Sequence, residues 1–130
     1  MILKNGSFIN ESNIDYIKVV MHLPAEYNRS AYPVYSAVLN NTSFTLCEEE
    51  YNSLLLCSRN FKTITFSTGS VAINGCPSNT EMVVHVNKNN VTSASCFDET
   101  ESFYCIRFVS ETVLYTCSKD TIKIISTQKI

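Results

Sequence analysis

The stretch Phe61-Lys-Thr-Ile-Thr-Phe66 carries polar and apolar side chains in alternation and is rich in aromatic and β-branched residues. Successive side chains of a strand point to opposite faces, so this pattern predicts a strand with one buried face. Thr68-Gly-Ser70 supplies a turn signal shortly after it. The chain is therefore expected to be built from short strands joined by polar turns.

Similar segments recur about every ten residues along the chain, separated by Asn, Ser, Gly and Pro. They lie at residues 17–23, 34–39, 71–73, 81–86, 91–96, 103–109, 113–117 and 121–125. Asn74-Gly75, which follows one of them, is the commonest dipeptide of a two-residue hairpin turn. Nine or ten short strands at this spacing are typical of an all-β sandwich or barrel, and we expect a two-sheet β-sandwich.

One short segment, residues 48–56, favours a helix instead. It contains no β-branched residue, and Glu48, Glu49 and Glu50 would place negative charge in the first helical turn. Tyr51, Leu54 and Leu55 would share one face. The alternative is a hairpin that places Cys47 opposite Cys57; we favour the helix.

Six cysteines and six glycosylation sequons indicate a secreted protein. None of the cysteines lies in a Cys-x-x-Cys motif, so we expect up to three disulfides of unknown pairing. The cysteines are Cys47, Cys57, Cys76, Cys96, Cys105 and Cys117, and the sequon asparagines are Asn5, Asn10, Asn28, Asn40, Asn41 and Asn90. The N-terminus has no signal-peptide pattern and no segment is long enough to span a membrane. We therefore expect residues 1–130 to be one monomeric binding domain cut from a longer secreted protein.

The sequence argues against an enzyme or a metalloprotein. His22 and His85 are the only histidines, and both lie in predicted strands with apolar neighbours. Paired cysteines cannot act as nucleophiles, and no nucleophile-elbow or phosphate-loop motif is present. The acidic segments lack the spacing of a calcium loop. We expect no catalytic residue, no metal and no cofactor.

Charge is unevenly distributed, although the formal net charge is only −2. Two long segments, 30–58 and 89–106, contain no Lys or Arg. Their acids are Glu48, Glu49, Glu50, Asp98, Glu99 and Glu101. If these residues share a face, they would attract a basic ligand. Alternatively, they are solvated surface. Nucleic acid is not an expected partner, because it requires a basic stripe.

Two parts of the chain resemble a known family. Asn5-Gly-Ser-Phe8 followed by Asn13-Ile-Asp-Tyr-Ile-Lys-Val-Val-Met-His-Leu-Pro24 is similar to the entry strand of the SECRET domain of poxviral tumour-necrosis-factor-receptor homologues. Asn41-Thr-Ser-Phe-Thr-Leu-Cys-Glu-Glu-Glu-Tyr-Asn-Ser-Leu-Leu55 resembles the family's polar strand, cysteine and Glu-Glu-Tyr-x-x-x-Leu segment. The resemblance covers about a third of the chain.

The resemblance implies a β-sandwich that sequesters host chemokines, which are mostly basic proteins. We accordingly expect a secreted viral immune-evasion domain that binds its ligand through an acidic sheet and loop surface. Tyrosines are enriched at binding hot spots and join the expected contacts. The expected contacts are Glu48, Glu49, Glu50, Tyr51, Asp98, Glu99, Glu101, Tyr104 and Glu111.

Two other functions fit the same sequence. An immunoglobulin-like receptor-binding module of a viral or cell-surface glycoprotein would use Cys47 and Cys105 as its inter-sheet disulfide. The chain has no Trp, which such domains usually bury. A purely structural ectodomain would instead expose a large apolar patch.

Overall fold

The computed structural model describes residues 1–22, 32–57, 60–67, 81–98 and 103–126. These residues form eight strands, two α-helices and two short 3-10 turns. The strands are β1 (Tyr16–His22), β2 (Tyr32–Leu39), β3 (Thr42–Leu46), β4 (Phe61–Ser67), β5 (Glu81–Asn87), β6 (Val91–Asp98), β7 (Phe103–Phe108) and β8 (Val113–Thr116). The helices are α1 (Glu48–Cys57) and α2 (Thr121–Ser126), and the 3-10 turns are η1 (Glu11–Asn13) and η2 (Lys88–Asn90).

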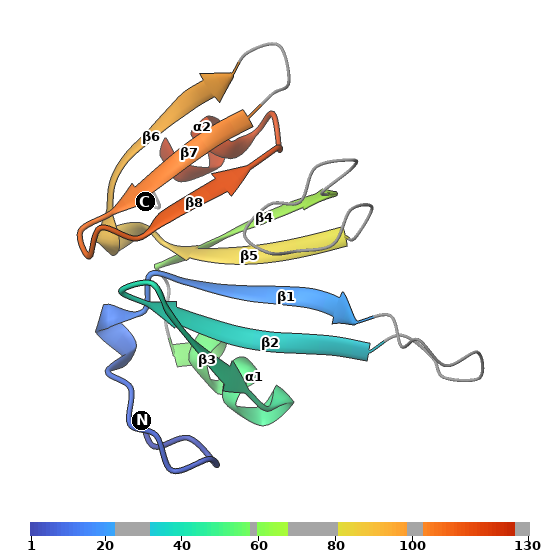
Figure 1. The fold of residues 1–130 in the computed structure, drawn as a ribbon, viewed down its shortest axis with the longest axis vertical. Coiled ribbons are helices and arrows are strands. Elements are labelled where there is room, and N and C mark those ends of the chain that lie inside the picture. Colours follow the sequence, from blue (N-terminus) through green and yellow to red (C-terminus); the bar gives the residue numbers. More distant parts are fainter. Residues whose placement is uncertain (23–31, 58–59, 68–80, 99–102, 127–130) are drawn as a thin grey trace.

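The strands form two antiparallel sheets (Figure 1). The larger sheet has the order β3-β2-β1-β5-β4, and the smaller has the order β6-β7-β8. Consecutive strands pair across β1–β2, β2–β3, β4–β5, β6–β7 and β7–β8, and β1 also pairs with β5, far along the chain. These two sheets confirm the expectation of a mostly β fold.

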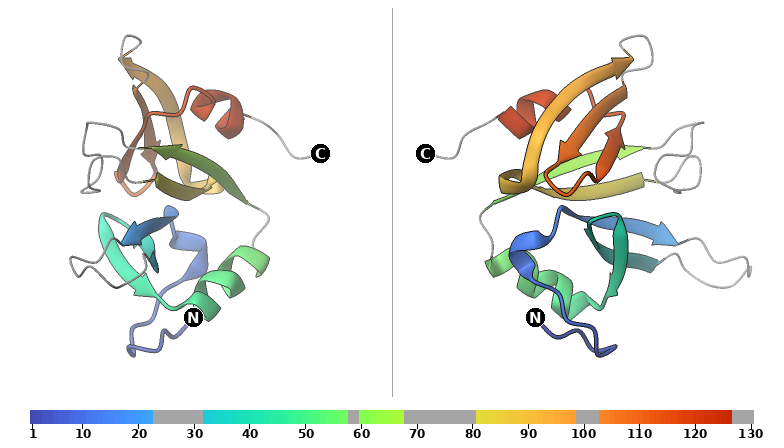
Figure 2. Two further views of the ribbon diagram at one scale, coloured as in Figure 1. Left: turned by 90° about the vertical axis from the view of Figure 1, so that its right-hand side faces the viewer. Right: turned by 60° about the vertical axis from the view of Figure 1, so that its left-hand side comes forward.

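Successive side chains of a strand point to opposite faces, and each face of the larger sheet contributes to a separate core. On one face, Ile64, Val84 and Met82 share a core with Ile106 and Leu114 of the smaller sheet. On the other face, Ile17 and Ala37 share a second core with Leu54 of α1 and the N-terminal segment. Figure 2 shows α1 and that segment at one end of the molecule and the smaller sheet with α2 at the other.

Most of the strand predictions are confirmed with small changes at the ends. The alternating stretch that starts at Phe61 is β4, an edge strand of the larger sheet. Residue-by-residue patterning missed β3, a short polar edge strand. The segment expected at 71–73, with its Asn74-Gly75 turn, lies outside the described residues.

The predicted final strand at 121–125 is wrong, because this segment is α2. Its isoleucines favour a strand locally, but packing decides otherwise. As a helix, it buries Thr121 and Ile125 on one face and leaves Ile122 and Lys123 exposed. Thr121 Oγ1 donates to the carbonyl of Ser118 at 2.8 Å and fixes the start of the helix.

The short helix expected after Cys47 is confirmed as α1, so the hairpin alternative is wrong. Tyr51 N donates to Cys47 O at 3.0 Å in its first turn. Leu54 is buried and Tyr51 and Leu55 are partly buried on the face that meets the sheet. The 3.6-residue period of these three positions therefore matches the observed packing.

The structure contains none of the expected disulfides among the cysteines whose side chains it describes. Cys47, Cys96, Cys105 and Cys117 form no disulfide with one another, while the side chains of Cys57 and Cys76 lie outside this description. Cys96 is paired in register with Tyr104, the residue next to Cys105, so strand alternation directs Cys96 and Cys105 to opposite faces. The Cys47–Cys105 bond of the immunoglobulin-like alternative is likewise absent.

Candidate functional site

The three predicted glutamates at the start of α1 do not play the same role. Glu48 and Glu49 are exposed, and Glu49 Oε2 lies 3.5 Å from Lys4 Nζ. Glu50, in contrast, is only 9 % exposed. The expectation that all three point outward is therefore corrected for Glu50.

Glu50 closes the N-terminus of α1. Its Oε1 accepts from Cys47 N and its Oε2 from Lys4 N, each at 2.9 Å, while its own N–H donates to Cys47 Sγ at 3.4 Å. This reciprocal pattern is a capping box with a cysteine in the usual Ser or Thr position. The hydrogen bond from the Cys47 backbone, opposed by burial, holds the pKa of Glu50 below its ordinary value. Glu50 is therefore a structural residue.

Tyr51 is also engaged inside the molecule. Its ring stacks on Tyr35 at 4.3 Å between centroids, and its hydroxyl lies 2.6 Å from Nε2 of His85. Nδ1 of His85 lies 2.8 Å from Oγ1 of Thr63. Burial lowers the pKa of His85 and, with the neighbouring Tyr35, raises that of Tyr51. This cluster joins α1 to the sheet, so the predicted contact role of Tyr51 has no support in its position.

The end of β6, the only described part of the second group of acidic residues, lies far from α1. Asp98 ends β6 at the top of Figure 1, whereas α1 lies at the bottom, and the views of Figure 2 agree. Glu99 and Glu101 lie outside the described residues. Tyr104 is half-buried in β7. The start of α1 and the end of β6 therefore do not form one acidic face.

The last predicted contact, Glu111, lies at a pocket that patterning did not predict. The pocket has a volume of about 540 Å³ and lies where the β2–β3 and β7–β8 turns meet the start of β1. We call it the hairpin-tip pocket. Its lining residues are Asn13, Asp15, Leu39, Asn40, Asn90, Val109, Ser110 and Glu111.

Asp15 organises this pocket from a buried position, with 1 % of its surface exposed. Its Oδ2 accepts from Asn40 N at 3.1 Å and from Ser110 Oγ. Ser110 Oγ also lies 2.9 Å from Thr112 Oγ1, which accepts from Asn41 N at 3.0 Å. One carboxylate thus holds two hairpin turns together.

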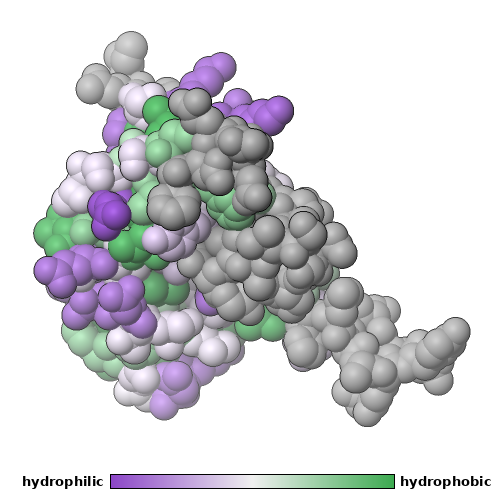
Figure 3. Space-filling view, turned by 45° about the horizontal axis from the view of Figure 1, so that its top comes forward, coloured by the Kyte–Doolittle hydropathy of each residue, from purple (hydrophilic) through white to green (hydrophobic). Residues whose placement is uncertain are grey.

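Backbone conformation marks the same place. Asn40 and Asn41 have φ values of 46° and 63°, as a tight hairpin turn requires, and asparagine tolerates them. Glu111 has a φ of 70°, a left-handed conformation that glycine usually fills. Its side chain is exposed and, within the described residues, makes no hydrogen bond or ion pair. In Figure 3, hydrophilic and hydrophobic side chains lie side by side at the left edge, the end that carries these turns in Figure 1.

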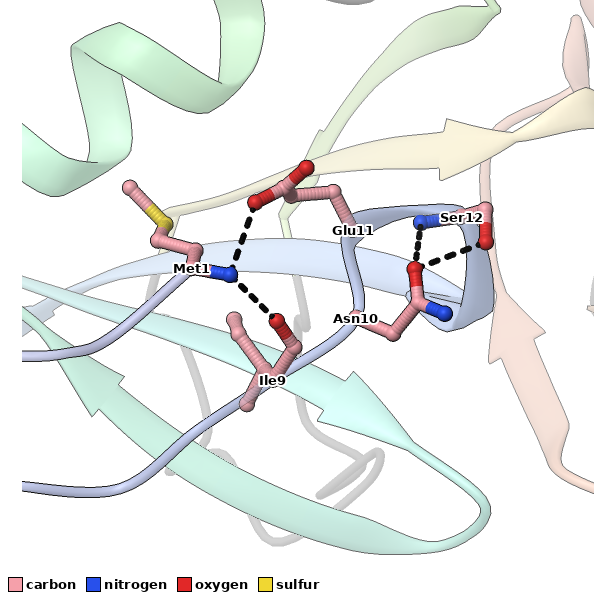
Figure 4. Close-up of polar contacts among 5 residues, drawn as sticks. All are labelled: Met1, Ile9, Asn10, Glu11 and Ser12. Atoms are coloured by element: carbon pink, nitrogen blue, oxygen red, sulfur yellow. Dashed lines mark hydrogen bonds and ion pairs between the residues drawn. The ribbon is translucent and has the colours of Figure 1, made fainter.

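A second pocket of about 350 Å³ adjoins the first and shares Asn90 with it. Its wall includes η1, which Asn10 caps by accepting from Ser12 N at 3.2 Å and Ser12 Oγ at 2.9 Å (Figure 4). The amine of Met1 lies close to η1, 2.8 Å from Ile9 O and 3.0 Å from Glu11 Oε1. These contacts close the N-terminal segment on itself, because they join Met1 to Ile9 and Glu11.

The sequon asparagines differ in accessibility. Asn5, Asn10, Asn40 and Asn41 are exposed, and Asn28 lies outside the described residues. The amide nitrogen of Asn90 donates to Ser12 O at 3.0 Å and to Ile14 O at 3.1 Å. A glycan attaches to this nitrogen, so the folded structure disfavours modification at Asn90.

Sequence reasoning identified Glu111 but missed Asp15, Asn13 and Ser110. Two signals were available: Ser110-Glu111-Thr112 joins two predicted strands, and Asn40-Asn41 directly follows another. Their meeting depends on how the two sheets pack, which strand patterns do not encode.

In the part of the chain that the structure describes, no three His, Cys, Asp or Glu side chains gather into a possible metal site. No helix in that part has the length and apolar character needed to cross a membrane. Comparisons with protein-family models, curated proteins and solved structures found no match.

Proposed function

We propose that this chain is a β-sandwich domain of a secreted viral immune-evasion protein that captures basic protein ligands, with host chemokines as the first candidates. The observation that supports this most is the hairpin-tip pocket. Its charged lining residues are Asp15 and Glu111, and no basic residue is among the described residues that line it. Such a pocket attracts cationic groups and repels anionic ones.

The resemblance to SECRET domains adds support from the same region. Its entry-strand segment begins at Asn13, and both Asn13 and Asp15 line the pocket. The sandwich that the resemblance implies agrees with two sheets whose facing residues share one core.

The proposed contact surface differs from the one expected from sequence. It is centred on Glu111, with exposed Glu48 and Glu49 adding negative potential from the start of α1. Glu50 and Tyr51 are left out, because both serve to hold α1 in place.

Surface plasmon resonance of the 130-residue chain against a panel of chemokines tests the proposal. We expect binding below micromolar dissociation constants for at least one member, with an association rate that falls as salt increases. No binding to any member in this range would refute the chemokine assignment.

A further inference from the structure

We propose that the hairpin-tip pocket receives one arginine side chain of the basic partner. This inference rests on the proposed function for its choice of a basic protein. It goes further by naming the group recognised and the residues that recognise it. Three features of the pocket carry it: an uncompensated buried charge, the set of acceptors, and the conformation of Glu111.

The first feature is the charge of Asp15. Buried carboxylates in proteins are normally compensated by a cation, because transfer out of water is unfavourable. In the described residues, Asp15 Oδ2 accepts only neutral donors, Asn40 N and Ser110 Oγ, and the carboxylate has no ion-pair partner. A cation seated in the pocket would supply the missing positive charge.

The second feature is the chemistry of the walls. Asn13, Asn40 and Ser110, whose side chains carry oxygen acceptors, line the pocket together with Asp15 and Glu111. Guanidinium has five N–H donors in a planar fork, so it suits several spread acceptors better than the compact lysine ammonium does.

The lining also suits the rest of an arginine side chain. Leu39 and Val109 add apolar surface, and Val109 is 68 % exposed. Arginine places its aliphatic stem along such surface while its charged head finds acceptors. The pocket therefore offers both kinds of contact that this side chain uses.

The third feature is that an acidic residue occupies a glycine position. Glu111 adopts φ 70°, where a side chain is strained relative to glycine. Its carboxylate stabilises nothing within the described structure, yet it stands at the pocket's edge. Local strain without a structural benefit points to a role in binding.

The test is an NMR titration of the ¹⁵N-labelled 130-residue chain with N-acetyl-arginine amide. We expect saturable shifts of the Ser110, Glu111 and Asn40 amides. N-acetyl-lysine amide should bind at least about fivefold more weakly, since it lacks the bidentate fork. Absence of saturable shifts at the pocket, or equal binding of the two compounds, would overturn the proposal.

Two variants with the same change in charge localise the effect. Glu111→Gln should weaken arginine-amide binding about tenfold, the range of a lost charge-assisted hydrogen bond. Asp120→Asn removes an exposed carboxylate that lies outside the pocket lining and outside the proposed contact surface, and it should leave binding unchanged. Equal effects of the two variants would show general charge attraction and would overturn the proposal.

The chemokine assignment and the arginine site can be refuted independently of each other. Arginine-amide binding at the pocket without binding to any chemokine refutes the chemokine assignment and leaves the arginine site standing. Chemokine binding that is insensitive to Glu111→Gln refutes the arginine site and leaves the proposed function standing.

Discussion

Glu50 and Cys47 hold each other across the first turn of α1: the glutamate Oε1 accepts from Cys47 N at 2.9 Å, and Glu50 N donates to Cys47 Sγ at 3.4 Å. The same carboxylate also accepts from Lys4 N, so it ties the N-terminal segment to the helix. One side chain therefore stabilises two neighbouring segments.

Replacing Glu50 by alanine is expected to lower the free energy of unfolding by about 1–2 kcal/mol, because two backbone donors lose their acceptor. Urea denaturation measures this loss. Glu48→Ala, in the same helical turn but exposed, should change stability by about 0.5 kcal/mol or less. Equal losses in the two variants would contradict the capping role.

The lowered pKa of Glu50 predicts a pH dependence of stability. Its folded-state pKa lies below the ordinary value of 4.5, so the unfolded chain binds the proton more tightly. The stabilisation is complete above pH 4.5 and is lost as the pH falls through the folded-state pKa. Denaturation series from pH 6 to pH 3 should show a shallower decline for Glu50→Gln than for the parent chain.

His85 also makes the free energy of unfolding fall as the pH falls, but in a higher pH range than Glu50 does. Burial lowers its pKa below 6.5, so the neutral imidazole between Tyr51 and Thr63 is stable above that pH. Stability should fall as the pH drops below 6.5, by at most about 1.4 kcal/mol per pH unit. The difference in slope between the parent and His85→Gln from pH 7.5 to 5.5 isolates this contribution. Identical slopes would show that the imidazole does not titrate with folding.

Glu111→Gly should raise the free energy of unfolding by about 1 kcal/mol, because glycine adopts φ 70° without strain. The same substitution removes the exposed carboxylate of the hairpin-tip pocket. Thermal unfolding checks the first effect, and the arginine-amide titration checks the second. A variant that gains stability and loses binding would show a residue kept for function at the expense of stability.

Thiol exposure predicts an order of chemical labelling. Cys96 is exposed, whereas Cys105 is only 3 % exposed. Iodoacetamide labelling followed by peptide mass spectrometry should modify Cys96 first and Cys105 only on unfolding. Protection of Cys96 in the native chain, reversed by a reductant, would instead reveal a disulfide and restore the sequence-based expectation.

Local sequence patterns correctly predicted the strands and helices whose structure is determined by their own residues. The alternation at β4 and the acidic start of α1 are such cases, since each follows from its own side chains. The isoleucines of α2 led to the wrong prediction of a strand. Their local strand preference is outweighed by the packing of Ile125 against the core, which a helix allows.

The candidate site was harder to predict for a related reason. Glu50 was expected in the acidic first turn of a helix, but its hydrogen bond from Lys4 N involves a segment distant in sequence. Asp15 gave no local signal, because its partners come from turns far along the chain. Of the candidate site, only the two turns could be predicted from local sequence.

The hydrogen bond between Asp15 and Ser110 joins positions 95 residues apart in the chain. Closing so large a loop is slow and entropically unfavourable, so this contact is expected to form late in folding. During synthesis, the pocket can form only after β7 and the turn that follows it have been made, because that turn supplies part of its lining. A ligand specific for the pocket would therefore bind only finished molecules and, by mass action, draw newly made chains toward the native state.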